Sequence, residues 1–194
     1  MLFRSSPVVA GVAGSFTVTA WDAYGNRAVG YTGTIRITSS DAQAVLPGDY
    51  KFTAADAGTH SLSAVLKTAG TRSLSATDAA SAAVTGIESV TVKPAAASRL
   101  VLGAPVSAPA SAKFSLTVTV VDAYGNVVVG YRGTITFRSS DSTAKLPKNY
   151  RFTASDSGVH TFTGLVLKKK GKQTIAVTDT LNSSLTASVL IDVS

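Results

Sequence analysis

Residues 22–26 have the sequence Asp-Ala-Tyr-Gly-Asn, and residues 122–126 repeat it unchanged. The alignment set by these two pentapeptides continues without a gap to His60 and His160. Of the 39 paired positions in this stretch, 24 are identical. After His160 one residue is inserted, and the similarity then continues toward the end of the chain. The chain is therefore an internal duplication.

The period of the duplication is close to 100 residues. Solenoid units are 20–50 residues long, whereas a copy of this size can enclose its own core. The duplication predicts two domains, residues 1–97 and residues 98–194. They meet near the sequence Lys-Pro-Ala-Ala-Ala-Ser at 93–98, where Pro94 ends any regular ladder. A joint this short and free of Gly-Ser runs predicts modest bending between the domains.

Apolar and polar residues alternate along the chain in the pattern of β-strands. The sequence Phe-Ser-Leu-Thr-Val-Thr-Val-Val at 114–121 alternates with period two, as does Phe-Thr-Val-Thr-Ala at 16–20. Several such runs per copy, separated by turn residues, predict a β-sandwich. Further runs occur at 133–138, 160–168, 173–178 and 187–193. In the second copy, parity predicts an inward set of Leu116, Val118, Val120, Ile135, Phe137, Phe162, Ile175, Val177, Val189 and Ile191.

Four motifs occur in the same order in both copies: Asp-x-x-Gly-Asn, Gly-x-x-Gly-Thr-Ile, Asp-x-Gly-x-His and a late Thr-Asp that follows Gly, an aliphatic residue and Ala or Val. This order resembles the bacterial immunoglobulin-like repeats of invasin- and intimin-type adhesins and of large repetitive surface or secreted proteins. The resemblance covers both copies and implies an all-β fold class, two tandem immunoglobulin-like β-sandwich domains. It further implies an extracellular or cell-surface spacer whose partners are neighbouring repeats of a longer chain.

The composition argues against several classes of function. The chain has no cysteine, two histidines and only 15% charged residues. The missing cysteines exclude a disulfide scaffold, a thiol catalyst and a Cys-ligated zinc site. No window approaches the roughly 18 apolar residues of a membrane-spanning helix. We expect no enzyme activity and no cofactor.

The net charge of +7 is unevenly distributed. Residues 1–97 contain 7 Lys/Arg and 6 Asp/Glu, a balance of +1, whereas residues 98–194 contain 11 and 5, a balance of +6. A general nucleic-acid-binding protein is more often basic throughout, with aromatic residues among its charges. A nucleic-acid partner is therefore not expected, and binding to another anionic polymer stays open.

The first copy departs from the pattern at its start. The second copy opens with the apolar sequence of residues 99–105, whereas only Met-Leu-Phe-Arg stands at residues 1–4. Residues 1–14 lack the apolar stretch of a signal peptide. We expect a truncated first strand in a piece of a longer repeat protein. An uncovered sheet edge there would favour pairing with another chain.

The repeated pentapeptide has two interpretations. A turn uses Gly for positive φ and Asp or Asn side chains to bind nearby backbone. A calcium loop needs several more oxygen ligands and a bidentate glutamate, but the chain has one glutamate, Glu88. The sequence therefore favours a turn at 22–26 and at 122–126, and no metal site.

His60 and His160 each follow an aspartate by four residues, which invites comparison with a catalytic triad. Their strand parity instead places each ring on the inner face at the start of a strand. The chain also lacks a Gly-x-Ser-x-Gly elbow. We predict half-buried structural imidazoles and no catalytic residue.

Two features are candidates for binding. Trp21 has outward parity and suits either stacking on a sugar or packing at the sandwich rim. Lys168, Lys169, Lys170 and Lys172 lie at a predicted hairpin tip, which suits an anionic polymer or a solvated turn that blocks edge pairing. The sequence does not show whether Lys145, Lys148 and Arg151 lie on the same side.

Two functional hypotheses follow. The first is a non-catalytic structural spacer or stalk module in an extracellular, adhesin-like bacterial repeat protein. The second is a carbohydrate- or polyanion-binding accessory module that uses Trp21 or the Lys168–Lys172 tip. The second hypothesis requires measurable affinity that is lost on Trp21→Ala or when the tip is neutralised.

Overall fold

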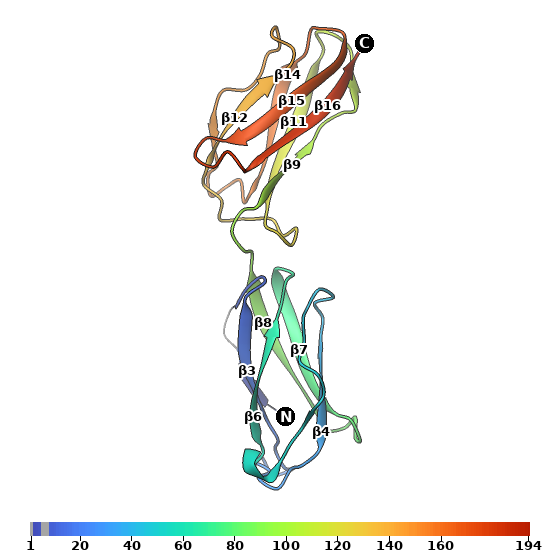
Figure 1. The fold of residues 1–194 in the computed structure, drawn as a ribbon, viewed down its shortest axis with the longest axis vertical. Helices are drawn as coiled ribbons and strands as arrows, with labels where there is room; N and C mark the ends of the chain where they lie inside the picture. The colour runs from blue at the N-terminus through green and yellow to red at the C-terminus, as the bar shows by residue number, and fades with distance from the viewer. Residues whose placement is uncertain (1, 5–7) are drawn as a thin grey trace. The chain divides into compact units, whose positions relative to one another are not determined.

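The structure of the chain is a computed structural model that describes the backbone of residues 2–4 and all of residues 8–194. Contacts divide the chain into two compact units, Met1–Ala95 (unit 1) and Ala96–Ser194 (unit 2). Both units consist of β-strands (Figure 1).

The division falls two residues before the boundary at 97 and 98 that the duplication predicts. Ala97 packs against the core of unit 2. The backbone N–H of Ser98 donates to the carbonyl of Val121 at 2.9 Å. These contacts attach the last residues of the joint to unit 2.

Unit 1 is built from a three-stranded and a five-stranded sheet. The strand orders are β1-β3-β6 and β2-β8-β7-β4-β5. Every pairing is antiparallel except that of β2 with β8, which is parallel. The strands are β1 (Leu2–Arg4), β2 (Val8–Val9), β3 (Ala13–Thr19), β4 (Thr34–Ser39), β5 (Tyr50–Lys51), β6 (Thr59–Val65), β7 (Gly70–Asp78) and β8 (Thr85–Lys93).

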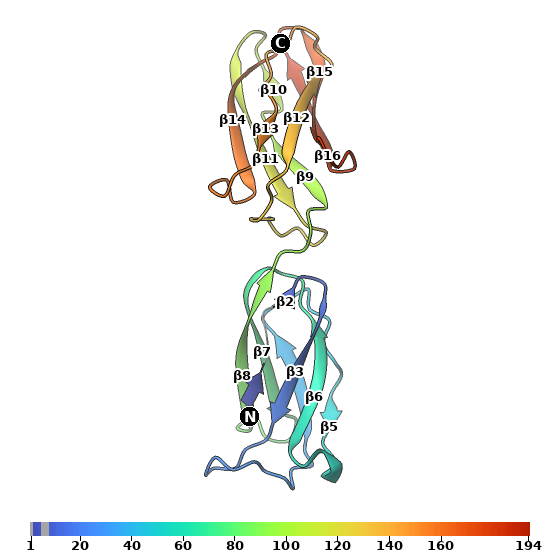
Figure 2. The ribbon, with the colours of Figure 1, turned by 90° about the vertical axis from the view of Figure 1, so that its left-hand side faces the viewer.

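Unit 2 repeats this topology (Figure 2). Its sheets have the orders β9-β11-β14 and β10-β16-β15-β12-β13, and β10 pairs with β16 in parallel. The strands are β9 (Arg99–Gly103), β10 (Ser107–Ala108), β11 (Lys113–Val121), β12 (Thr134–Ser139), β13 (Tyr150–Arg151), β14 (Val159–Val166), β15 (Gly171–Asp179) and β16 (Thr186–Val193).

Side-chain parity places the core between the two sheets of each unit. Nine of the ten residues predicted to face inward in unit 2 are buried, and Val189 is partly buried against the same core. In unit 1, Phe16, Val18 and Ala20 of the first predicted strand are buried as well. The period-two pattern therefore predicted the inner faces correctly.

The first strand of unit 1 is present but short. β1 has three residues and pairs with Thr17–Thr19 of β3, whereas β9 has five and pairs with Thr117–Val121 of β11. The predicted truncation at residues 1–4 falls partly on Met1, which lies outside the described residues.

The helical content of the described chain is a short 3-10 turn, Ala54–Asp56. None of the described helical residues forms a segment long and apolar enough to span a membrane.

Candidate functional site

The repeated pentapeptide forms a closed turn in both units. Asp22 Oδ1 accepts the N–H groups of Tyr24 at 2.9 Å and Asn26 at 2.8 Å, and its Oδ2 accepts the Asn26 amide at 3.1 Å. Gly25 takes the positive φ of 81° that the turn requires. Hydrogen bonds from Asn26, with smaller ones from Tyr24 and Gly25, lower the pKa of Asp22. The carboxylate therefore acts as a turn-former, as predicted.

A second aspartate, Asp41, is buried and holds two loops together. Its carboxylate accepts the backbone N–H of Lys67 at 2.6 Å, of Thr68 at 2.9 Å and of Gln43 at 3.0 Å. The Thr68 hydroxyl donates to the same carboxylate at 2.5 Å. Burial acts to raise the pKa of Asp41, but these hydrogen bonds outweigh it and lower the pKa to about 2.

Asp141 does the same in unit 2. It accepts the backbone N–H groups of Lys168 at 2.6 Å and Lys169 at 3.0 Å, and also binds Thr143. Hydrogen bonds from Lys169, Thr143 and Lys168 hold the pKa of Asp141 well below its usual range. This pair of clamps was not predicted from the sequence. The available signal was the identical Ser-Ser-Asp in both copies at 39–41 and 139–141.

A third aspartate, Asp78, is the last residue of β7 in unit 1. Tyr31 Oη donates a short hydrogen bond to Asp78 Oδ2, while Asp78 Oδ1 accepts the N–H groups of Ala80 at 2.7 Å and Ser81 at 2.9 Å. Burial of the Tyr31 hydroxyl raises its pKa most, and the hydrogen bond to Asp78 raises the pKa further. A Cβ on Gly33 would collide with both the tyrosine hydroxyl and the carboxylate.

The equivalent contact in unit 2 is between Tyr131 and Asp179, and Gly133 takes the place of Gly33. The carboxylate of Asp179 accepts the N–H groups of Leu181 and Asn182. This contact is thus duplicated, as are the turn at Asp22 and the clamp at Asp41.

The predicted histidine site contains a Tyr–Asp–His network. In unit 1, His60 Nδ1 lies 2.8 Å from Asp56 Oδ1, and Tyr50 Oη donates to the same oxygen at 3.0 Å. Thr53 donates its N–H and its hydroxyl to Asp56 Oδ2 at 2.6 and 2.8 Å. The His60 ring stacks on Tyr50 with the ring centroids 3.7 Å apart.

Unit 2 reproduces the network. His160 Nδ1 lies 2.6 Å from Asp156 Oδ1, and Tyr150 and Thr153 donate to the same carboxylate. Both histidine side chains are 29% exposed, which is the half-buried state that parity predicts.

The network has the first two members of a triad, an aspartate and a histidine. Because a carboxylate accepts hydrogen bonds, the tautomer that carries a proton on Nδ1 is the one that fits. A nucleophile would have to bind Nε2, and in the described part of the chain no hydroxyl does so. Hydrogen bonds from Thr53, with smaller ones from His60 and Tyr50, depress the pKa of Asp56. The network fastens the 3-10 turn to the start of β6.

Trp21 points outward, as predicted, and is 42% exposed. Tyr24 in the adjoining turn is 91% exposed. The equivalent of Trp21 in unit 2 is Val121, which is 5% exposed because Ser98 and Arg99 run alongside it. This position is therefore much more exposed to solvent in unit 1 than in unit 2.

The predicted lysine tip connects β14 to β15. Lys168, Lys169, Lys170 and Lys172 are all exposed. Lys145 lies beside this tip, because its backbone pairs with Val166, two residues before Lys168. Arg151 pairs with Thr134 at the opposite end of β12 and is not part of the cluster.

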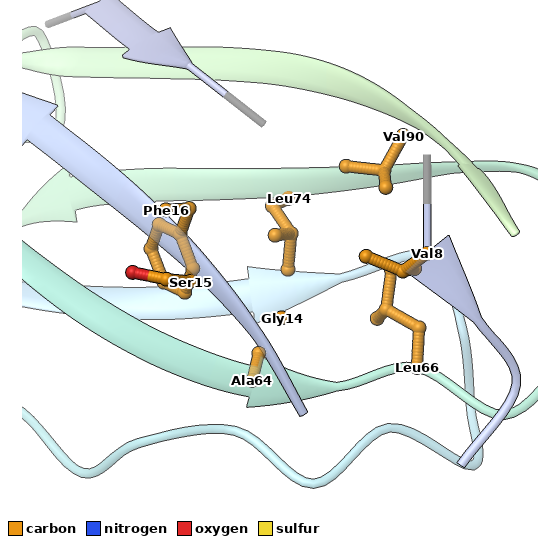
Figure 3. Close-up of a pocket in the computed structure, with 8 residues that line it drawn as sticks. All are labelled: Val8, Gly14, Ser15, Phe16, Ala64, Leu66, Leu74 and Val90. Carbon is orange, nitrogen blue, oxygen red and sulfur yellow. The ribbon is translucent and has the colours of Figure 1, made fainter. Parts of the chain in front are cut away.

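The hollows lined by described residues of unit 1 include the following two. The first lies between β2, β3, β6, β7 and β8, and its lining consists of Val8, Gly14, Ser15, Phe16, Ala64, Leu66, Leu74 and Val90 (Figure 3). Its volume of about 10 Å³ is about that of one water position, too small for an organic ligand. The second, of about 190 Å³, lies over β4 and β7 and is lined by Arg36, Thr38, Thr77, Asp78 and Ala79.

The polar side chains described above form hydrogen bonds to the backbone and to other side chains of the same unit. Within residues 2–4 and 8–194, no three His, Asp or Glu side chains gather closely enough to hold a metal ion. Arg36 at the larger hollow is already paired with Asp49 through two hydrogen bonds of 3.0 and 3.2 Å.

No protein-family model matches the chain, and no curated protein matches it. Solved structures do. The Escherichia coli adhesin FdeC is similar to 99% of this chain with a TM-score of 0.50 and 20% identity, and the chain spans 64% of that structure. The adhesin InvE of Yersinia pseudotuberculosis matches 98% of the chain and 58% of its own length, with a TM-score of 0.42 and 16% identity.

A β-glycosidase from Bacteroides vulgatus matches 98% of the chain but only 24% of its own length, with a TM-score of 0.46 and 14% identity. At these identities the comparisons bear on the fold. The likeness to FdeC, together with the two-sheet topology, shows that this all-β chain has an immunoglobulin-like fold of the kind found in bacterial adhesins.

Proposed function

We propose that the chain is a non-catalytic spacer made of two tandem immunoglobulin-like β-sandwich domains, and that it belongs to an extracellular, adhesin-like bacterial repeat protein. The observation that carries the proposal is the duplication of the three aspartate clamps. In unit 1, Asp41 ties two loops together, Asp78 holds the turn after β7, and Asp56 binds His60 at the start of β6. The corresponding carboxylates of unit 2 are those of Asp141, Asp179 and Asp156. Groups that would otherwise form a reactive site are engaged in stiffening the sandwich.

The outer faces of the sheets support the same role. Hydroxyl groups pair across neighbouring strands, as in Thr17 with Ser61 and Thr117 with Thr161, each at 2.9 Å. Such hydroxyl pairs stabilise the neighbouring strands and keep these parts of the outer faces polar. The edge strands of the two five-stranded sheets, β2, β5, β10 and β13, have two residues each. Short edges limit pairing with other chains.

The short joint between the units also supports the spacer role, because a short connection limits bending. β8 ends at Lys93 and β9 begins at Arg99, so residues 94–98 alone connect the two units. Two of those residues, Ala97 and Ser98, are already bound to unit 2.

Single-molecule stretching of the intact chain, held at its two ends, tests the proposal. Two separate unfolding events are expected, and each should release about 340 Å of chain (95 residues at about 3.6 Å each) less the folded length of the unit. One event of twice that length, or extension without a resolved event, would contradict a spacer of two independent domains.

A second candidate function is binding of a neutral carbohydrate at Trp21. Two aromatic side chains are exposed at the turn of residues 22–26: Tyr24 lies in the turn, and Trp21 directly precedes it. The faces of such rings stack on sugars. A screen against neutral insoluble polysaccharides tests this function. Retention that Trp21→Ala abolishes and Val121→Ala leaves intact supports it, and absence of retention excludes it for those polymers.

A further inference from the structure

The fold brings two further lysines to the tip at Lys168–Lys172. Val166, near the end of β14, pairs with Lys113 of β11 on one side and with Lys145 on the other. Neighbouring strands are about 4.8 Å apart. Lys113 and Lys145 therefore flank the strand that leads into the tip. We call the six residues Lys113, Lys145, Lys168, Lys169, Lys170 and Lys172 the lysine apex.

The side chains of Asp141 and Gln173 hold the backbone of the tip in place. Asp141 accepts the N–H groups of Lys168 and Lys169. The buried Gln173 lies under the tip, with its Nε2 at 3.5 Å from the Lys170 carbonyl, and its Oε1 accepts the Ser140 hydroxyl at 2.7 Å. A ligand therefore has to order the lysine side chains but not the loop, which lowers the entropic cost of binding.

The ammonium groups of the apex are available to a ligand. All six lysines are exposed, and none forms an ion pair within the part of the chain that the structure describes. Two aspartates lie at this end of unit 2. Asp141 is buried and engaged by backbone N–H groups, and Asp192 is exposed on β16 opposite Lys172. The positive charge exceeds the negative charge at this end.

Unit 1 provides the matched comparison. The six corresponding residues are Ala13, Val45, Lys67, Thr68, Ala69 and Thr71, of which one is a lysine. Asp41 holds the same loop there in the same way, through the N–H groups of Lys67 and Thr68. The loop architecture therefore does not require the six lysines, since the same clamp forms in unit 1 with Lys67 as the one lysine among the corresponding residues.

From this convergence of six exposed lysines on a fixed loop, present in one copy and absent from the other, we propose that the apex of unit 2 binds an anionic polysaccharide. The lysine ammonium groups would contact its sulfate or carboxylate groups. This proposal goes beyond the spacer function and does not depend on it.

A polysaccharide fits the apex better than a nucleic acid does. Binding of single-stranded nucleic acid relies on aromatic side chains on which bases stack. No aromatic side chain of unit 2 is exposed. The apex also lacks arginine, whose planar group reads guanine and phosphate in a bidentate way. Lysines are flexible point charges that suit a chain of separated anionic groups.

The test compares two variants of the full chain that lose the same charge. The apex variant carries Lys169→Thr, Lys170→Ala and Lys172→Thr, and the control variant carries Arg27→Val, Arg132→Thr and Arg138→Thr. Each substitution introduces the residue that occupies the same position in the other unit, so both variants retain side chains that this fold already accepts. Both lose three positive charges.

The probes are a heparin oligosaccharide of defined length, a neutral dextran and a DNA duplex that carries the same number of charges. Affinity is measured by titration at about 50 and about 200 mM salt. We expect the unaltered chain to bind heparin and not dextran. The apex variant should bind heparin at least about tenfold more weakly, and its slope of log K against log salt should be smaller by about 2 to 3. The control variant should stay within about twofold of the unaltered chain.

Three results would overturn the proposal. They are an equal loss of affinity in both variants, no binding of heparin at the lower salt concentration, and tighter binding of the DNA duplex than of heparin. Circular dichroism establishes that each variant is folded before titration. Should the triple apex variant unfold, the pair Lys170→Ala and Lys172→Thr replaces it, and this pair should bind heparin more than about twofold more weakly than the unaltered chain, outside the limit set by the control variant.

Discussion

Replacing Asp41 by alanine should destabilise unit 1 strongly and leave unit 2 unaffected. The change removes the acceptor of four hydrogen bonds, from the N–H groups of Lys67, Thr68 and Gln43 and from the Thr68 hydroxyl. A hydrogen bond to a charged acceptor contributes about 1.5 to 3 kcal/mol net. The donors lie on partly exposed loops where water replaces some of the lost bonds, so we expect a total loss of about 3 to 5 kcal/mol.

That loss is large for a domain of this size. A unit of 95 residues is expected to have a stability of about 5 to 14 kcal/mol. A loss of 3 kcal/mol should lower its Tm by about 12 to 24 °C, because each kcal/mol shifts a domain this small by about 4 to 8 °C.

The assay uses the single tryptophan of the chain. Trp21 lies in unit 1, so tryptophan fluorescence reports the unfolding of that unit, whereas far-ultraviolet circular dichroism reports both units. Asp41→Ala should lower the fluorescence-detected Tm. The matched variant Asp141→Ala should leave that transition in place and lower the other one. A loss below about 1 kcal/mol for Asp41→Ala would refute the clamp. An equal shift of the fluorescence transition by Asp141→Ala would refute the independence of the units.

Two further predictions concern the stability of the fold at low pH and the packing around a glycine. The pKa of Asp56 and that of Asp156 lie below their usual range when folded, so the stability that these carboxylates supply is present above the unfolded pKa of about 3.9 and is lost as the pH falls toward the folded value. The urea midpoint should therefore be nearly constant from about pH 7 to 5 and decrease below about pH 4, and a midpoint that rises on acidification would contradict the assignment. Gly133→Ala should cost about 1 to 3 kcal/mol in urea unfolding because its Cβ would collide with Tyr131 and Asp179, whereas Gly130→Ala, with open space around it, should change stability by less than about 0.5 kcal/mol.

The duplication and the period-two pattern were enough to predict the longer strands and their inward-facing residues. Alternation depends on neighbouring residues alone, so the inward positions of β11 could be predicted from the sequence, and Trp21 was correctly placed outside. The pentapeptide turn was equally predictable, because its hydrogen bonds join residues at most four positions apart.

The buried clamps could not be predicted in this way. Asp41 binds donors 26 and 27 residues away, and Asp141 binds donors 27 and 28 residues away. From the local sequence alone, Asp41 and Asp141 would be expected in exposed turns, whereas the fold buries both. The lysine apex has the same origin, since Lys113 and Lys145 lie beside the tip only because both pair with Val166, one on each side. The two-residue strands were also missed, because two residues show no period.

Calorimetry of the intact chain tests most directly whether it consists of two independently folding sandwiches. At about 0.7 kcal/mol per residue near 60 °C, each unit should unfold with about 65 to 70 kcal/mol and the chain with about 136 kcal/mol. Independent units predict a van't Hoff enthalpy of about half the calorimetric enthalpy, or two resolved peaks. A single peak whose van't Hoff enthalpy equals the full calorimetric value would show that the chain unfolds as one unit, and would contradict the spacer proposed here.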